Sequence, residues 1–246
     1  MKNPVLIYQM GKVGSAAIRD SLNAIGYPNY QVHYLRKPAI EKLEASIRER
    51  GEKTPPHIAR SKEVIDLGIL EKGVKVITLM RDPVARNVSA FFQNINSYFP
   101  NDDYRDVSSG ALIDKFISSY SHNVSTGWFS SEFKHVMGLD VTELEELRTS
   151  PYYALRHDGR DILLMKVESS DSDKKECLRA FLELDDEFEL LRTNIGNEKS
   201  YKDQYRQFLK KIVLPKEYLD AMYGSAVVRA FYQEEEIESM RSKWTR

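Results

Sequence analysis

The 246-residue chain is poor in cysteine, in net charge and in long apolar runs. Cys177 is its only cysteine, which excludes a disulfide within the chain, and its helical surroundings predict a buried core thiol rather than a nucleophile. Lysine and arginine number 36 against 37 aspartates and glutamates, a balance that argues against a general nucleic-acid or membrane-surface binder. Any site for an anion must therefore be local.

No run approaches the roughly 20 apolar residues that a membrane-spanning helix needs. The first apolar segment is only about a strand long and has no cleavage-site pattern. We therefore expect a cytoplasmic protein without a signal peptide and without stable membrane insertion. A metal-ligand cluster is not evident either, so we expect no metal site.

Strands separated by helices are expected along most of the chain. The patterns predict strands at about 4–10, 31–35 and 74–80, and a hairpin that joins 152–156 to 161–167. Helices are expected at about 15–25, 38–50 and 61–70, from 83 onward, over much of 109–147, and after about 173. This order implies an α/β fold in which helices flank a central, mainly parallel sheet, as one domain over residues 1–246. Ligands then bind at the carboxyl ends of the strands.

Segment 5–15, VLIYQMGKVGS, is the most informative part of the chain. It predicts a buried strand, a tight loop and the start of a helix, where unpaired backbone N–H groups and the helix dipole favour an anion. Gly11 and Gly14 let the backbone approach a ligand, while Lys12 supplies a charge and Ser15 a hydroxyl. The loop favours phosphate or sulfate, although Gly-Lys-x-Gly loops also serve as plain connections. It is not the ATP-binding pattern, because no Gly-Lys-Ser/Thr occurs in the chain.

A second motif begins where the apolar strand VKVITLM ends. Asp82 as N-cap and Pro83 as first helical residue predict a helix directly after Arg81. Arg86 and Ser89 lie three residues apart on one face of that helix. A guanidinium with a hydroxyl suits a phosphate, because arginine presents paired donors to two oxygens. By itself the motif fits equally well an Arg81 paired with a carboxylate and a Ser89 that faces a polar groove.

Together the two motifs resemble those of the sulfotransferases that use 3′-phosphoadenosine 5′-phosphosulfate (PAPS). The resemblance implies a P-loop NTPase-like three-layer sandwich. It also implies that segment 9–15 is the 5′-phosphosulfate loop and that Arg81 and Ser89 hold the 3′-phosphate. The residues that it implies for the loop's side of the cofactor site are Gly11, Lys12, Val13, Gly14, Ser15 and Ala16. The chain departs from the common loop, which has proline before the lysine and often two threonines after the glycine.

The later chain resembles a bacterial, sulfotransferase-like family of capsular polysaccharide biosynthesis. The resemblance lies in GWFSSEFK at 127–134, MGLDV at 137–141, LLMKVE at 163–168, Asn194 with 199–201, and the tail around 231–236. It implies that Lys199 and Tyr201 belong to a loop that covers the nucleotide. Trp128 and Phe129 could line an acceptor groove, but buried packing is the simpler expectation for them.

The chemistry expected from the resemblance is transfer of a sulfuryl group from PAPS to a hydroxyl of a carbohydrate or related acceptor, with the product 3′-phosphoadenosine 5′-phosphate (PAP). Lys12 would stabilise the leaving phosphate. His33, expected at the end of the second strand, is the first candidate for the base, since an imidazole titrates near neutral pH. His57, expected in the Pro-Pro-His loop, is the second candidate. Glu168 is a third, although a structural carboxylate fits it better.

Other functions remain compatible with these motifs. A P-loop-type nucleotide-dependent kinase would share the fold, and a non-catalytic glycan- or anion-binding relative would share the loop. A capsule-pathway glycosyltransferase fits the family label but not two phosphate clamps. The sequence specifies neither the acceptor nor the oligomeric state.

Overall fold

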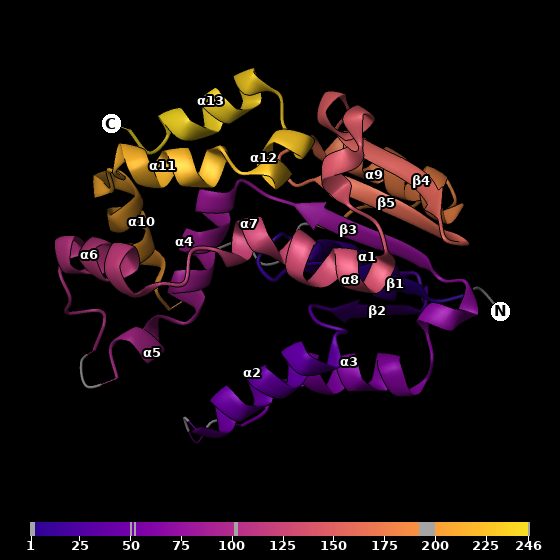
Figure 1. Cartoon of the computed structure of the whole chain (residues 1–246), viewed down its shortest axis with the longest axis horizontal. Coiled ribbons are helices and arrows are strands. Elements are labelled where there is room, and N and C mark those ends of the chain that lie inside the picture. Colours follow the sequence, from indigo (N-terminus) through magenta and orange to yellow (C-terminus); the bar gives the residue numbers. More distant parts are fainter. Residues whose placement is uncertain (1–2, 50, 52, 101–102, 192–199, 246) are drawn as a thin grey trace.

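A single sheet organises the residues that the computed structural model describes, which are 3–49, 51, 53–100, 103–191 and 200–245. Within them, five strands form the order β2-β1-β3-β5-β4 (Figure 1). The strands are β1 (Val5–Tyr8), β2 (Asn29–Val32), β3 (Lys75–Met80), β4 (Tyr152–His157) and β5 (Arg160–Lys166).

The first four strands of this order run parallel, and β4 pairs antiparallel with β5 at the edge. Every residue of β1 is buried, as is nearly all of β3, because both strands have sheet neighbours on each side. The parallel register, with Ile7 opposite Ile77 and Ile77 opposite Leu163, brings the carboxyl ends of β1, β3 and β5 to one edge of the sheet. Loops that follow these strands therefore meet there.

Helices flank this sheet (Figure 1). The helices before β4 are α1 (Ser15–Ala24), α2 (Lys37–Glu49), α3 (Pro56–Asp66), α4 (Pro83–Gln93), α5 (Ile95–Tyr98), α6 (Ser109–Ser119), α7 (Val124–Trp128) and α8 (Lys134–Met137). The later ones are α9 (Asp171–Leu182), α10 (Lys202–Lys211), α11 (Lys216–Tyr223), α12 (Ala226–Phe231) and α13 (Glu234–Ser242). A π-helical turn, Phe129–Phe133, joins α7 to α8.

The expected α/β class and the mainly parallel sheet flanked by helices are confirmed. The hairpin is also confirmed, with His157 opposite Arg160. Asp82 caps α4 as expected, because its carboxylate accepts from the backbone N–H groups of Val84 and Ala85. None of the helices in the described ranges is long and apolar enough to cross a membrane.

Two expected boundaries were wrong. The helix expected at 61–70 begins at Pro56, so His57 lies in its first turn rather than in a loop. Proline at the first helical position has its φ preset for the helix. The second strand ends at Val32 rather than at residue 35, because the next backbone groups bond to side chains instead of β1. Trp128 Nε1 donates to the carbonyl of His33, and the N–H of Leu35 donates to Glu132.

Candidate functional site

The loop between β1 and α1 has the backbone of a close-approach site. Lys12 and Gly14 both adopt left-handed conformations, each with φ of 74°. For Lys12 this conformation costs about 1 kcal/mol, a strain that often marks functional positions. Gly14 is the N-cap of α1 and provides no side chain to accept from the first N–H groups of the helix. The start of α1 therefore keeps donors that can face an anion.

Two arginines from the second motif hold this loop by its carbonyl groups. Arg81 Nη1 donates to the carbonyl of Lys12 over 2.9 Å, and Arg86 Nε donates to the carbonyl of Gly11 over 2.9 Å. Arg81 follows β3 directly, and Arg86 lies on the first turns of α4. The two sequence motifs thus form one site at the carboxyl edge of the sheet.

Ser15 lies between two glutamine side chains. Its side chain is buried, and its Oγ lies 2.7 Å from Gln9 Nε2 and 2.6 Å from Gln31 Nε2. These contacts fix the position of the hydroxyl at the start of α1. The Gln9 side chain is fully buried, and its Oε1 has no hydrogen-bond partner.

Two histidines lie beside the loop. His33 Nδ1 is 2.9 Å from the carbonyl of Gln9, which can only accept, so Nδ1 carries the proton and Nε2 is the basic nitrogen. A Cβ added at Gly11 would lie 3.6 Å from that Nε2, so glycine permits the close approach. The His57 ring lies 5.2 Å from the His33 ring, centroid to centroid. Both base candidates therefore lie near the loop.

Burial keeps both imidazoles neutral. The pKa of His33 falls to about 4, mainly because of burial; the hydrogen bond to the Gln9 carbonyl opposes the fall, and charge on His57 and Arg86 adds to it. Burial also lowers the pKa of His57. Neutral imidazoles can accept a proton, although a base of such low pKa is a weak one.

Other predicted site residues are less closely engaged. Ser89 is half-buried on α4, and no hydrogen bond of its side chain occurs within the described ranges. Tyr201 packs against Phe92 of α4, with ring centroids 5.7 Å apart. The side chain of Val13 is fully buried, so only its backbone can serve a ligand. Asn194 and Lys199 lie outside the described residues.

Several residues of this site are not evident from the sequence motifs. Arg86 was expected on the phosphate-facing side of α4 but not on the carbonyl of Gly11, and Gln9 and Gln31 were not singled out. Glu132 was also missed: its Oε1 accepts from Tyr8 Oη at 2.7 Å and from the N–H groups of Leu35 and Arg36 at 2.6 and 3.0 Å. A charged residue within the aromatic segment FSSEF was the only signal for it.

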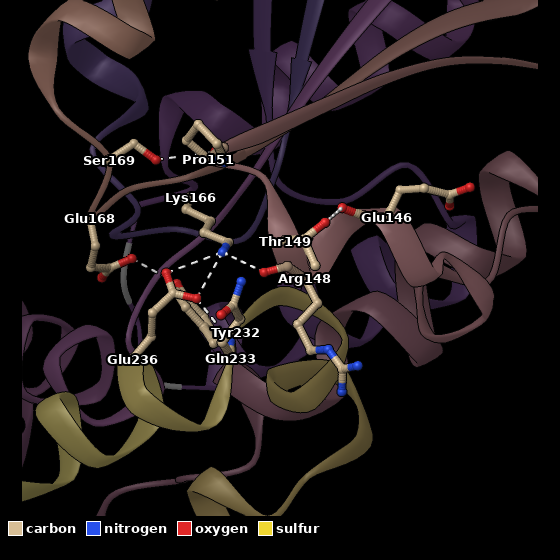
Figure 2. Close-up of polar contacts among 10 residues, drawn as sticks. All are labelled: Glu146, Arg148, Thr149, Pro151, Lys166, Glu168, Ser169, Tyr232, Gln233 and Glu236. Atoms are coloured by element: carbon tan, nitrogen blue, oxygen red, sulfur yellow. Dashed lines mark hydrogen bonds and ion pairs between the residues drawn. The ribbon is translucent and has the colours of Figure 1, made fainter.

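The surroundings of three further candidates indicate a structural role. Glu168 accepts from Tyr232 Oη (Figure 2). It also accepts from the backbone N–H of Asp82, and both bonds match the expected structural carboxylate. Cys177 is buried, and burial raises its pKa to about 12, so it is an inert thiol. Trp128 and Phe129 are buried in the core, as expected from packing. The described part of the chain has no cluster of three potential metal ligands.

Comparison with known proteins gives one match. The model of the NKWYS family, described as "Putative capsular polysaccharide synthesis protein", matches residues 106–233, slightly more than half of the chain. No curated protein and no solved structure matches the chain. The matched range includes Trp128, Glu132 and β5, which brace the site, but it excludes the Lys12 loop and both arginines. The chain therefore belongs to the NKWYS family of capsular polysaccharide synthesis proteins.

Proposed function

We propose that this protein transfers a sulfuryl group from PAPS to a hydroxyl group of a carbohydrate. One observation carries the proposal: Arg81 and Arg86 donate to the carbonyls of the Lys12 loop, so two separate phosphate motifs share one site. The family's description supports a carbohydrate acceptor.

The donor set around the loop fits an anionic nucleotide. Lys12, the start of α1 and the Ser15 hydroxyl would hold the 5′ end of PAPS. Arg81 and Ser89 would hold the 3′-phosphate, and Tyr201 packs against Phe92, three residues after Ser89 on α4. A buried guanidinium without a carboxylate, that of Arg86, also suits a ligand of negative charge.

Catalysis would depend on positioning and charge. PAPS supplies, when bound, a sulfuryl group already activated by its bond to a phosphate. The Lys12 ammonium would stabilise negative charge on a phosphate oxygen at the start of α1. His33 Nε2 would accept the proton of an acceptor hydroxyl, and its Nδ1–H bond to the Gln9 carbonyl fixes the tautomer that this requires. His57 is the second candidate for this role.

Calorimetry and transfer assays on two variants test the proposal. Lys12→Ala should lower sulfate transfer from PAPS by at least about 100-fold, since removal of one charge-stabilising donor costs that much. PAP binding should stay measurable. Arg81→Ala should weaken PAP at least about tenfold but change the affinity for adenosine 5′-phosphosulfate, which lacks the 3′-phosphate, very little. Arg156→Ala, which removes an exposed arginine of β4, is the matched control.

Two results would contradict the proposal. One is that both variants bind PAP and turn over PAPS like the wild type. The other is that ATP with Mg²⁺ raises the melting temperature and PAP does not, because a specific ligand stabilises the protein that binds it. That second result would favour a kinase.

A further inference from the structure

Arg86 carries a buried positive charge that no acidic group neutralises among the residues that the structure describes. Only 7% of the residue is exposed. Its partners are the Gly11 carbonyl, Tyr120 Oη at 2.8 Å and Asn87 Oδ1 at 3.3 Å, all of them neutral. No carboxylate forms an ion pair with Arg86 within the described ranges. The guanidinium stays charged at any physiological pH, so protonation changes cannot relieve this burial.

Removing a charge from water without a counter-charge is unfavourable, and proteins normally pair such groups. Three neutral acceptors satisfy N–H groups of Arg86 but leave its net charge in place. A buried cation of this kind is expected where a ligand supplies the opposite charge.

The position of Arg86 indicates which ligand group that is. Its Nε bonds the carbonyl of Gly11, the residue that also lies against His33 Nε2 and precedes Lys12. The Arg86 charge also lowers the pKa of His33. Arg86 and His33 therefore both lie at Gly11, next to Lys12 in the chain, whereas Arg81 bonds the carbonyl of Lys12 itself.

We infer that Arg86 binds a tetrahedral oxyanion at Gly11, on the His33 side of the Lys12 loop. In terms of the proposed function, on which this assignment rests, that oxyanion is the sulfuryl end of PAPS. Arg86 would then neutralise the group that is transferred, while Arg81 and Ser89 hold the other end of the nucleotide. The inference itself requires only a sulfate-like anion.

Thermal unfolding with millimolar sodium sulfate, against sodium chloride of equal ionic strength, tests the role of Arg86 without an activity assay. Sulfate should raise the melting temperature of the wild type by mass action. Arg86→Gln, which keeps a donor only at the position of Nε and removes the charge, should lose most of that shift, with the sulfate Kd raised at least about tenfold. In chloride alone Arg86→Gln should melt somewhat below the wild type, because Tyr120 Oη and Asn87 Oδ1 lose their donor, so the readout is the shift that sulfate adds to each protein's own baseline.

Arg156→Gln is the control for general salt effects and should keep the wild-type sulfate shift, since Arg156 is an exposed residue of β4. Arg86→Lys retains the charge and serves if Arg86→Gln does not fold; it should keep part of the shift. A sulfate shift in Arg86→Gln equal to that of the wild type would overturn the inference. If only Arg86→Lys folds, an undiminished sulfate shift in that variant would overturn it. Absence of any sulfate shift in the wild type would also overturn it. A normal sulfate response without transfer from PAPS would instead refute the proposed function and leave the role of Arg86 standing.

Discussion

Two buried cations at the same edge of the sheet differ in what neutralises them. Lys166, the last residue of β5, is 4% exposed, and its Nζ lies 2.9 and 3.1 Å from the carboxylate oxygens of Glu236 (Figure 2). The carbonyl of Arg148 and the ring face of Tyr232 complete its surroundings. Arg86 is similarly buried, but its hydrogen-bond partners in the described part of the chain are all neutral. The charge of Lys166 is therefore neutralised by a carboxylate of the chain, whereas no carboxylate in the described residues neutralises that of Arg86.

This difference distinguishes a cation with a structural role from one that can bind an anion. Lys166 and Glu236 tie the end of β5 to α13, and Glu168 joins the same region to the start of α4 through the N–H of Asp82. These groups need no ligand. Arg86 lies one strand away, against the glycine loop, where an anion would complete its charge balance.

The largest effect is expected when Lys166 loses its carboxylate partner and becomes, like Arg86, a buried cation without a counter-charge. Glu236→Gln leaves the Lys166 charge without a carboxylate and should lower the free energy of unfolding by about 2–3 kcal/mol. The loss stays below that of a fully buried pair, because the Glu236 side chain is 40% exposed and solvent screens it. Urea unfolding measures it.

Lys166→Met in the Glu236→Gln background is the matched control, and it should recover most of the loss by removing the unpaired charge. A Glu236→Gln variant as stable as the wild type would show that a buried cation here needs no counter-charge. Arg86 would then need no anion to neutralise its charge.

The pH dependence of stability measures the same environment through His33. Its pKa of about 4 in the folded protein lies below the ordinary value of 6.5, so the unfolded chain binds more protons between these values. The stabilising contribution of His33 is therefore present above about pH 6.5 and is lost as the pH falls through 6.5 toward 4. Between pH 6.5 and 5 the wild type should lose about 1.5 kcal/mol more stability than His33→Asn.

Urea unfolding at the two pH values gives this difference. In Arg86→Gln the His33 pKa should rise, because the Arg86 charge no longer opposes protonation. Equal pH dependence in the wild type and His33→Asn would contradict the depressed pKa.

The smallest effect is expected at Glu132, a buried side chain of opposite charge whose hydrogen-bond donors, like the partners of Arg86, are neutral. Glu132 is 2% exposed, and its Oε1 accepts from one phenol and two backbone N–H groups. Bonds to an ionised acceptor are stronger than those to an amide, so Glu132→Gln should lower the free energy of unfolding by about 1 kcal/mol. Tyr8→Phe, which removes one of the donors, is the companion variant.

If Glu132→Gln is instead more stable than the wild type, neutral partners do not suffice for a buried ion in this fold. Arg86, which also has neutral partners, would then need an anion for the same reason. A loss well above 1 kcal/mol would show that neutral donors can stabilise a buried charge well, and would weaken the inference that Arg86 binds an anion.

The sequence predicted the local parts of the site well. Alternation of apolar segments with loops predicted β1, β3 and β5, and Asp82-Pro83 predicted the start of α4, since a cap acts within one turn. Because parallel strands share a carboxyl edge, the order of elements also predicted that the two motifs would meet. It did not predict where β2 ends, because Trp128 and Glu132 compete with β1 for its backbone groups from about a hundred residues away.

Local pattern alone thus determined the strand-loop-helix that presents Lys12, Gly14 and Ser15, because backbone conformation and helix capping depend on neighbours in the chain. Only the tertiary structure decided that Arg86 bonds Gly11, that His33 Nε2 approaches the same glycine, and that Lys166 is paired whereas Arg86 is not. Burial and the choice of partner depend on how distant elements pack. For that reason a buried cation can be structural in one place, as Lys166 is, and a proposed anion-binding residue in another, as Arg86 is.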